Sequence, residues 1–451
     1  MRTIEKDFVV IRVHSRLNNS LTIRNGLLID PSRHLEGKYD LLLKGGRVAE
    51  VAPAGKLRGK GDENLDARGM VVCPGLIDIH VHLREPGQTH KETIASGTLA
   101  AAAGGFTSVC CMPNTSPVND NAEITRWMQD PARGAHVNVF PIGAATIGSK
   151  GEQLTDFSSL KSAGAVAVTD DGKPILDQAI MRQALLGAGK LGIPVIQHAE
   201  DTRMTAGAAM HAGATAFRLG LRGWVPEAES SLVERDIRLA AETRAHYHVA
   251  HLSTAAALKA VRRAKRDHLR VTCEVAPHHF TLLDEDVGDY DTNFKMNPPL
   301  RSRADREALI AGLMDGSIDC VATDHAPHAG NEKNQEFDHA PFGITGLETA
   351  LGLCISTLHS KNKIPLSRIV ELLSVNPARV MGLQGRGTLA VGSHADVTVF
   401  NPARKWTYAA AESYSKSKNS PFDGWHLQGK VMATVVGGAV KFAADARRSG
   451  M

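Results

Sequence analysis

The chain reads Pro74-Gly75-Leu76-Ile77-Asp78-Ile79-His80-Val81-His82 at the point where an apolar, largely β-branched run ends in two histidines. Residues two apart in a strand point to the same side, so His80 and His82 can bind one ion while Val81 faces away. Imidazole nitrogens are ligands that borderline divalent metals prefer. This stretch therefore predicts a buried strand that ends in a pair of metal ligands.

Four more residues that can bind a metal follow other short apolar runs, each at the end of a predicted strand. They are Asp171, His198, His251 and Asp324. Four histidines and two aspartates are the inventory of a hydrolytic site with one or two zinc ions. The sequence therefore predicts a metal-dependent enzyme.

From about residue 71, short β-branched runs alternate with longer amphipathic segments, which indicates repeated βα units and a parallel sheet. Strands are predicted at residues 71–79, 107–112, 136–142, 165–169, 194–197, 245–250, 270–275 and 317–323. Helices are predicted at residues 92–103, 178–190, 231–243, 255–266 and 304–315. Eight such units make a TIM-like (β/α)8 barrel of the α/β class, whose active sites lie at the carboxyl ends of the strands. All six metal candidates fall at these ends.

The segments on either side of the barrel predict short strands joined by Gly and Asn turns, with a hairpin at residues 431–441. Neither end alone has enough strands for a stable sheet. We therefore expect residues 1–70 and 388–451 to pair into one small composite β-sandwich domain beside a barrel of residues 71–387. Residues 406–421, with several Ser and Lys, are predicted to form a surface loop.

Composition narrows the functional classes. Hydrophobic residues are 43% and charged residues 22% of the chain, which is ordinary globular usage. The longest apolar runs fall short of the roughly 20 residues of a membrane helix. The N-terminus carries Arg2, Glu5, Lys6 and Asp7 and has no secretory pattern, so a cytoplasmic location is expected. Six cysteines without CxxC spacing predict buried, reduced thiols.

A nucleic-acid partner is not expected either. The net charge is only +4, and aromatic residues are 5% of the chain. The basic cluster at residues 262–266 lies on the polar side of a predicted helix without aromatic neighbours, which indicates a solvated face.

Further motifs extend the opening stretch along nearly the whole chain. They are Leu83-Arg84-Glu85-Pro86-Gly87, Met112-Pro113-Asn114-Thr115, Thr169-Asp170-Asp171-Gly172, Lys295-Met296-Asn297-Pro298-Pro299-Leu300-Arg301 and Thr323-Asp324-His325-Ala326-Pro327-His328. The opening stretch resembles the signature of the metal-dependent amidohydrolase superfamily. The full set, in this order, resembles the dihydroorotases of the bacterial class I form.

This resemblance implies a zinc-dependent, reversible cyclisation of N-carbamoyl-L-aspartate to L-dihydroorotate, a step of pyrimidine biosynthesis. It implies one or two Zn²⁺ ions, with two favoured. His80 and His82 would hold the first ion, His198 and His251 the second, and Asp171 would bridge them. Asp170 is the alternative bridge, and Asp171 is preferred because its spacing to His198 matches the family pattern. Asp324 would bind the first ion and carry the proton in catalysis.

The resemblance also implies a substrate pocket, formed by His82, Arg84, Asn114, Asn297, His328 and the backbone at Phe342 and Gly343. The planar guanidinium of Arg84 suits a carboxylate, which lysine would not reproduce. Residues 329–341 are polar and are predicted to form a mobile lid. Three other histidines, His278, His279 and His325, are not expected to be ligands, and Glu332 and Glu336 are expected to be solvated.

Two other functions stay open. One is a related cyclic amidase, such as an allantoinase or hydantoinase, in which Arg84 serves a different acid. The other is a catalytically silent subunit that stabilises aspartate carbamoyltransferase, although such proteins have usually lost ligands that this chain keeps. The expected partners are a small-molecule substrate and a second copy in a homodimer, and association with aspartate carbamoyltransferase stays open.

Overall fold

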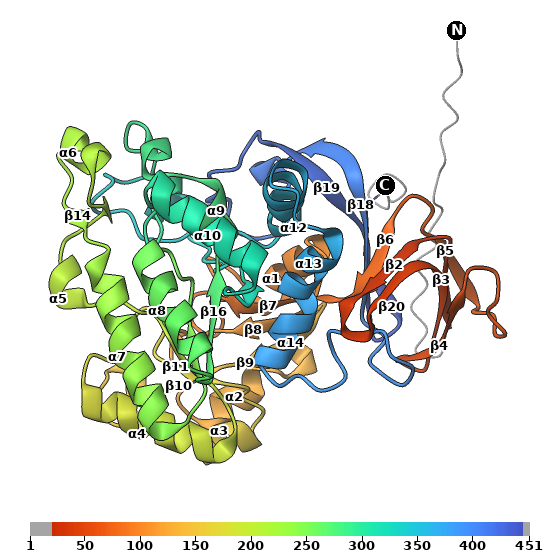
Figure 1. Ribbon diagram of the computed structural model, residues 1–451, viewed down its shortest axis with the longest axis horizontal. Helices are drawn as coiled ribbons and strands as arrows, with labels where there is room; N and C mark the ends of the chain where they lie inside the picture. The colour runs from red at the N-terminus through yellow and green to blue at the C-terminus, as the bar shows by residue number, and fades with distance from the viewer. Residues whose placement is uncertain (1–19, 445–451) are drawn as a thin grey trace, which may run out of the picture.

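Parallel strands alternate with helices through the middle of the chain (Figure 1). The computed structural model describes residues 20–444, and the predicted features of residues 1–19 and 445–451 lie outside the described residues. One parallel sheet contains β7 (Leu76–Val81), β8 (Phe106–Cys111) and β9 (Asn138–Pro141). A second contains β10 (Gly143–Ala144), β11 (Val168–Thr169), β12 (Val195–Gln197), β15 (Tyr247–Val249), β16 (Val271–Val275) and β17 (Cys320–Val321).

The two parallel sheets meet at both edges. Only Ile142 separates β9 from β10, and its N–H donates to the Cys111 carbonyl at 2.9 Å. At the other edge, Val81 of β7 pairs with His325 beyond β17. The His82 N–H also donates to the His325 carbonyl at 2.8 Å. The strands therefore curl until the first lies beside the chain that follows the last.

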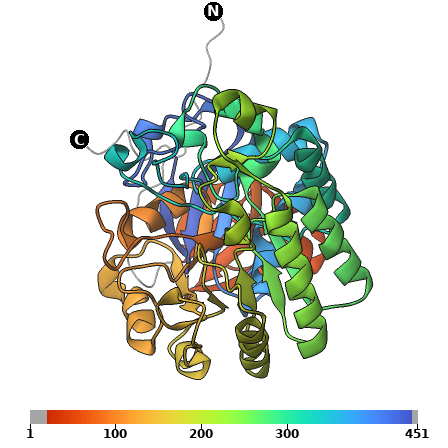
Figure 2. The ribbon, with the colours of Figure 1, turned by 90° about the vertical axis from the view of Figure 1, so that its left-hand side faces the viewer.

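Helices cover the outside of the curled strands (Figure 2). The five predicted helices are present as α1 (Ile94–Ala103), α4 (Gln178–Leu191), α7 (Glu227–Thr243), α8 (Ala255–Arg266) and α10 (Arg303–Asp315). Capping residues explain where some of them begin. The Thr93 hydroxyl accepts the Ser96 N–H at 3.0 Å, so α1 begins directly after Thr93.

The first predicted strand, residues 71–79, is divided between two sheets, so the prediction of one continuous strand is wrong. β6 (Val71–Pro74) pairs with β18 (Val397–Thr407), whereas β7 belongs to the parallel sheet. Gly75 lies at the break, and a Cβ there would come within 2.1 Å of the Thr107 hydroxyl oxygen. Only glycine permits this close approach, which allows the chain to pass from one sheet into the other.

Strands from both ends of the chain build a separate nine-stranded sheet, seen on the right of Figure 1. Its members are β1 (Leu21–Arg24), β2 (Leu27–Asp30), β3 (Leu35–Lys44), β4 (Arg47–Pro53), β5 (Glu63–Asp66), β6, β18, β19 (His426–Val436) and β20 (Ala439–Ala443). The two ends join through the antiparallel pair of β6 and β18. Apolar side chains from both ends share one core, including Leu28, Leu41, Val397 and Val435.

The segment after β18 differs from its prediction as a surface loop. Four of its polar side chains are buried: Ser415, Ser417, Asn419 and Ser420. Ser415 donates to Glu92, Ser417 to the Lys91 carbonyl and Asn419 to the Ala326 carbonyl. Polar side chains can be buried once each has a partner. The polar composition of this segment predicted exposure, because the partners that allow burial lie far away in the sequence.

All six cysteines lie within the described residues and are buried free thiols, as their spacing predicts. Within residues 20–444, none of the helices combines the length and apolar character that a bilayer crossing requires.

Candidate metal centre and substrate pocket

The six predicted ligands gather at the carboxyl ends of the parallel strands. His80 and His82 lie at the end of β7, and the other four follow β11, β12, β15 and β17 by one to three residues: Asp171, His198, His251 and Asp324. All six are buried, with at most 7% of each residue exposed. The structure thus brings together residues that are up to 244 positions apart (324 − 80) in the chain.

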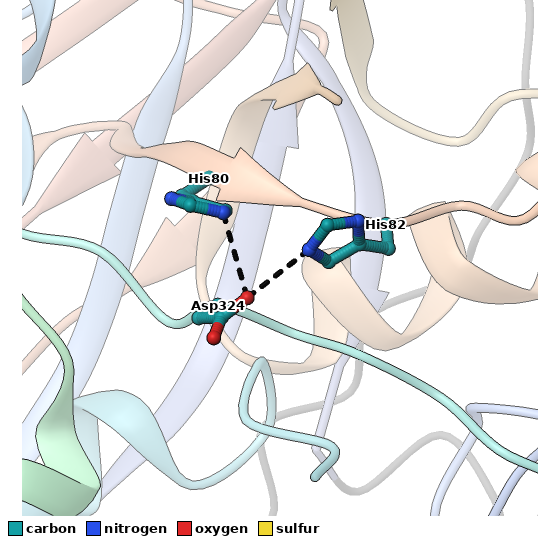
Figure 3. A group of neighbouring side chains, drawn as sticks. All are labelled: His80, His82 and Asp324. Carbon is teal, nitrogen blue, oxygen red and sulfur yellow. Dashed lines mark hydrogen bonds and ion pairs between the residues drawn. The ribbon is translucent and has the colours of Figure 1, made fainter. Parts of the chain in front are cut away.

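One group consists of His80, His82 and Asp324, which point toward one another in Figure 3. The Oδ1 atom of Asp324 lies 3.5 Å from His80 Nε2 and 3.1 Å from His82 Nε2. One ligand atom from each of the three lies within 4.8 Å of the others. These atoms are close enough to hold one ion.

Asp171 lies among all four histidines. Its Oδ1 atom is 3.4 Å from His80 Nε2, 3.7 Å from His198 Nδ1 and 3.8 Å from His251 Nε2. Its Oδ2 atom is 3.6 Å from His82 Nε2. A carboxylate that faces both pairs of histidines has the placement that a bridging ligand requires.

Asp170, the alternative, points elsewhere. Its carboxylate accepts the Thr146 N–H at 2.9 Å and also the Thr146 hydroxyl. Successive residues of an extended chain alternate in direction. The geometry therefore favours Asp171 over Asp170 as the residue available to a metal.

The donor set fits a divalent cation. His80 Nε2 and Asp171 Oδ1 are buried and have no hydrogen-bond partner within residues 20–444, although most buried polar atoms have one. Burial opposes a charge on His80, yet the carboxylates of Asp171, Glu274 and Asp324 together raise its pKa well above the ordinary value. The carboxylates that favour the protonated, positively charged form of His80 would also stabilise a bound metal cation.

Two buried carboxylates hold the rings of the metal-site histidines, and the sequence prediction missed both. Glu274 of β16 contacts His80 Nδ1 at 2.6 Å and His248 Nε2 at 3.2 Å. Glu200 contacts His198 Nε2 at 3.0 Å. Such partners fix ring orientation and raise ligand basicity. The signal in the sequence was a lone glutamate inside an apolar strand, since an unpaired charge is rarely buried.

Replacing Glu274 with glutamine is expected to weaken zinc binding by about 10- to 100-fold, because His80 loses its charged partner. Competition with a chromogenic chelator measures this affinity. Glu285→Gln is the matched control, since the Glu285 side chain is 61% exposed and pairs with the similarly exposed Arg303. Equal affinity in the Glu274→Gln and control proteins would show that Glu274 does not support the metal site.

Three site residues have a backbone conformation that L side chains rarely adopt. The φ angles are 59° at Arg84, 29° at His251 and 50° at Asp324. Positive φ costs about 1–3 kcal/mol per residue and persists only where the surroundings enforce it. The surrounding structure therefore holds these three residues in a strained backbone conformation.

The residues predicted to bind substrate lie beside the candidate metal ligands. Asn114 Oδ1 contacts His82 Nδ1 at 2.8 Å, and Asn297 donates to Glu200 at 2.8 Å while its own carbonyl oxygen has no partner within residues 20–444. Arg84 donates from Nε to the Pro327 carbonyl at 3.1 Å. Because this bond uses Nε, the two terminal nitrogens of the guanidinium remain free of the Pro327 carbonyl.

His328 lies against Arg84 and the Phe342 backbone. Its Nε2 atom is 2.8 Å from the Phe342 carbonyl and 3.3 Å from an Arg84 nitrogen, and its Nδ1 atom is 3.4 Å from Lys91 Nζ. The Phe342 carbonyl can only accept, so the proton of a neutral His328 lies on Nε2, which donates to Phe342, while Nδ1 accepts from Lys91. Burial, then Arg84 and Lys91, lower the pKa of His328 to about 3, which keeps it neutral.

Two of the three histidines not expected to be ligands have other hydrogen-bond partners, whereas the buried His278 Nε2 has none within residues 20–444. His279 Nε2 lies 2.9 Å from the Pro298 carbonyl, and His325 accepts the Gly346 N–H at 3.1 Å. His278 is buried, and burial lowers its pKa to about 4. Of the two glutamates predicted to be solvated, Glu336 is exposed, but Glu332 pairs with Lys91 at 3.1 Å.

The segment at residues 329–341 is anchored by a buried lysine. Lys333, at the end of α11 (Gly330–Lys333), donates from Nζ to the carbonyls of Lys295, Pro341 and Gly343 at 3.3, 2.9 and 3.2 Å. Burial lowers its pKa to about 7. The segment therefore has a fixed point within it, and its predicted movement as a lid stays a prediction.

Known proteins resemble this chain along nearly its full length. The family model described as "Dihydro-orotase-like" matches residues 69–257. A dihydroorotase of Solibacter usitatus (strain Ellin6076) is 51% identical over 424 residues, which cover 94% of this chain and 98% of the relative. A dihydroorotase of Geobacter sp. (strain M21) is 50% identical over 426 residues, which cover 94% and 100%. Among solved structures, an L-hydantoinase (dihydropyrimidinase) from Arthrobacter aurescens gives a TM-score of 0.83 at 23% identity, over 93% of this chain and 95% of that chain, so it shares the fold.

The α/β fold, the buried histidine and aspartate cluster and these likenesses define a cyclic amide hydrolase of the metal-dependent amidohydrolase type. Within that class, the chain belongs to the dihydroorotase family.

Proposed function

We propose that this protein catalyses the reversible cyclisation of N-carbamoyl-L-aspartate to L-dihydroorotate in pyrimidine biosynthesis. The observation that carries the proposal is the placement of Arg84 two residues beyond His82, where its buried guanidinium interacts electrostatically with the potential ligands Asp324 and Asp171. A ring-opening centre then lies next to a cation suited to the carboxylate of the substrate. The dihydroorotases that are about half identical to this chain support the same reaction.

The finer architecture belongs to the proposal. We infer a (β/α)8 barrel in which β9 and β10 are two parts of one strand, and the contact of Val81 with His325 supports its closure. Residues 1–70, 71–387 and 388–451 stay the predicted limits of the barrel and of a composite β-sandwich domain. Two zinc ions, a cytoplasmic location, a homodimer and association with aspartate carbamoyltransferase also stay predictions. Light scattering of the protein, alone and with the transcarbamoylase, tests both assemblies.

In this proposal His80, His82 and Asp324 would hold one Zn²⁺ ion, His198 and His251 a second, and Asp171 both. When bound, zinc polarises the carbonyl under attack and lowers the pKa of water. Glu274 and Glu200 hold the histidine rings in place for this task through the contacts at His80 and His198.

Asp324 would transfer the proton. In ring opening its carboxylate takes a proton from the attacking water and then delivers it to the departing ring nitrogen, acting first as base and then as acid. The position of Oδ1 near the Nε2 atoms of His80 and His82 supports this role.

The remaining pocket residues would orient the ring. Arg84 pairs with the substrate carboxylate, and the amides of Asn114 and Asn297 meet the polar edge of the ring. The unpartnered oxygen of Asn297 is an acceptor that a ring N–H can satisfy. His328 and the backbone at Phe342 and Gly343 close the other side.

Replacing Arg84 with lysine is expected to raise the KM for both L-dihydroorotate and N-carbamoyl-L-aspartate by about tenfold, because a single ammonium cannot form the paired contact. Steady-state kinetics in both directions measure the change. Arg68→Lys is a suitable control, since the Arg68 side chain is 78% exposed. An unchanged KM in the Arg84 variant would argue against the carboxylate contact.

The proposed function is tested by following L-dihydroorotate ring opening by ultraviolet absorbance on purified protein whose zinc content is measured in parallel. Turnover that chelation removes and zinc restores is the expected result. Turnover of hydantoin or allantoin in place of dihydroorotate would instead identify a related amidase. Bound zinc without turnover of any of these would favour the silent subunit.

A further inference from the structure

Residues 413–420, here called the strap, come from the C-terminal part of the chain and lie against the pocket loops. Ser417 donates to the Lys91 carbonyl at 2.6 Å, and the Lys416 N–H donates to Glu92 at 3.1 Å. At the far end of the strap, the Asn419 side chain is 4% exposed. The strap therefore crosses from the loop after β7 to the loop after β17.

Asn419 uses both hydrogens of its amide and one lone pair of its oxygen on the loop after β17. Its Nδ2 donates to the carbonyls of Ala326 at 3.1 Å and Gly343 at 3.0 Å, and its Oδ1 accepts the His328 N–H at 3.1 Å. Its own carbonyl accepts the Thr345 N–H at 2.9 Å. One buried side chain thus links the two ends of the segment at residues 329–341.

These contacts determine how far apart two parts of the pocket lie. His328 comes just before that segment and Gly343 just after it, and both belong to the proposed substrate pocket. Gly343 cannot be replaced by a larger residue without strain, because a Cβ there would lie 2.7 Å from the Ala326 Cβ and its φ is 129°. Because the Asn419 side chain bonds to both the His328 N–H and the Gly343 carbonyl, removing it would allow the distance between these two residues to change.

The other end of the strap reaches the turn that carries Asp324. Glu92 accepts the Ser415 hydroxyl as well as the Lys416 N–H, and it lies 3.4 Å from His325 Nε2. The His325 carbonyl in turn accepts the His82 N–H at 2.8 Å. Both ends of the strap therefore support backbone next to the site, and Asn419 contacts a residue of the substrate pocket directly.

We propose that Asn419 is a positioning residue for substrate binding, which fixes the spacing between His328 and the backbone at Phe342 and Gly343. The inference rests on the proposed function, since these groups bind substrate in it. Within residues 20–444, the hydrogen bonds of Asn419 go to Ala326, His328, Gly343 and Thr345, and none goes to the six potential metal ligands. Its effect should therefore fall on KM and leave metal content unchanged.

Asn419→Ala is expected to raise the KM for L-dihydroorotate by about tenfold, with kcat within about threefold of wild type, because two carbonyls and one N–H lose their buried partner. Asn401→Ala is the matched control. Asn401 also accepts two backbone N–H groups in the C-terminal region, at 3.0 Å from Ala403 and Arg404, but lies away from the pocket. Its kinetics should equal those of wild type.

Asn419→Asp gives a second test that does not depend on the alanine variant folding well. A carboxylate at this position faces two carbonyl oxygens, whereas its protonated form can donate to one of them and still accept the His328 N–H. The KM of this variant relative to wild type should therefore grow as the pH rises. A ratio that does not change with pH, together with an unchanged KM in Asn419→Ala, would overturn the proposal.

Hydrogen exchange separates this inference from the proposed function. The amide of His328 should exchange faster in Asn419→Ala than in wild type or Asn401→Ala, whatever the substrate of the enzyme. Wild-type protein without dihydroorotate turnover would contradict the proposed function alone. Unchanged exchange at His328 would show that Asn419 has no positioning role. A loss of both kcat and bound zinc in Asn419→Ala would show that Asn419 has only a general structural role.

Discussion

Asp324→Asn should lower kcat for dihydroorotate ring opening by about a thousandfold, within the range that a positioned acid or base contributes. Asparagine has nearly the same shape as aspartate, so it can occupy the same buried position near His80 and His82. Its amide cannot take a proton from water at neutral pH or return one to the ring nitrogen. The loss should therefore appear in both directions of the reaction.

Single-turnover and steady-state rates measure this loss, and zinc content is determined on the same samples. Zinc is supplied at saturating concentration, because Asp324 is also a potential ligand and its replacement is expected to weaken metal binding. Asp338→Asn is the control, since its side chain is exposed on the segment after α11. A kcat within tenfold of wild type in zinc-loaded Asp324→Asn would exclude the proposed proton transfer by this residue.

Periodicity and the ends of the predicted strands were sufficient to find the metal candidates. Each of the six lies at or just beyond a strand whose apolar run was visible in the sequence, and parallel strands bring their carboxyl ends to one edge. The fold itself imposes this proximity, so residues as distant as His80 and Asp324 could be grouped without knowing any contact. The direction of each side chain could not be read in the same way, as the pair Asp170 and Asp171 shows.

A lone glutamate inside an apolar strand marked Glu274, but the partners of the supporting residues could not be predicted, because they lie far away in the sequence. Glu274 and Asn419 are polar, and on composition alone a polar residue is expected at the surface. Each is buried because the groups around it complete its hydrogen bonds. Likewise, the break at Gly75 follows from its contact with Thr107 on the neighbouring strand, which no local pattern shows.

Asp171→Asn is expected to reduce bound zinc by at least one ion per chain and to lower kcat by about a hundredfold or more. The Asp171 carboxylate lies within 3.8 Å of a ring nitrogen of all four histidines, so its negative charge would stabilise a cation bound by either pair. Losing that charge leaves the ions with fewer anionic ligands in a buried site, where an uncompensated positive charge is costly. Elemental analysis and the rate of ring opening measure the two effects.

Asp170→Asn is the matched comparison, since it removes one charge at the adjacent position. Its carboxylate accepts the Thr146 N–H and hydroxyl, so this variant should lose thermal stability yet keep its zinc. The two variants are therefore expected to differ: Asp171→Asn should bind less metal, and Asp170→Asn should have a lower melting temperature. If Asp170→Asn lost the metal and Asp171→Asn kept it, the assignment of the bridging carboxylate would have to be reversed, and the backbone turn after β11 would have to differ from the one described.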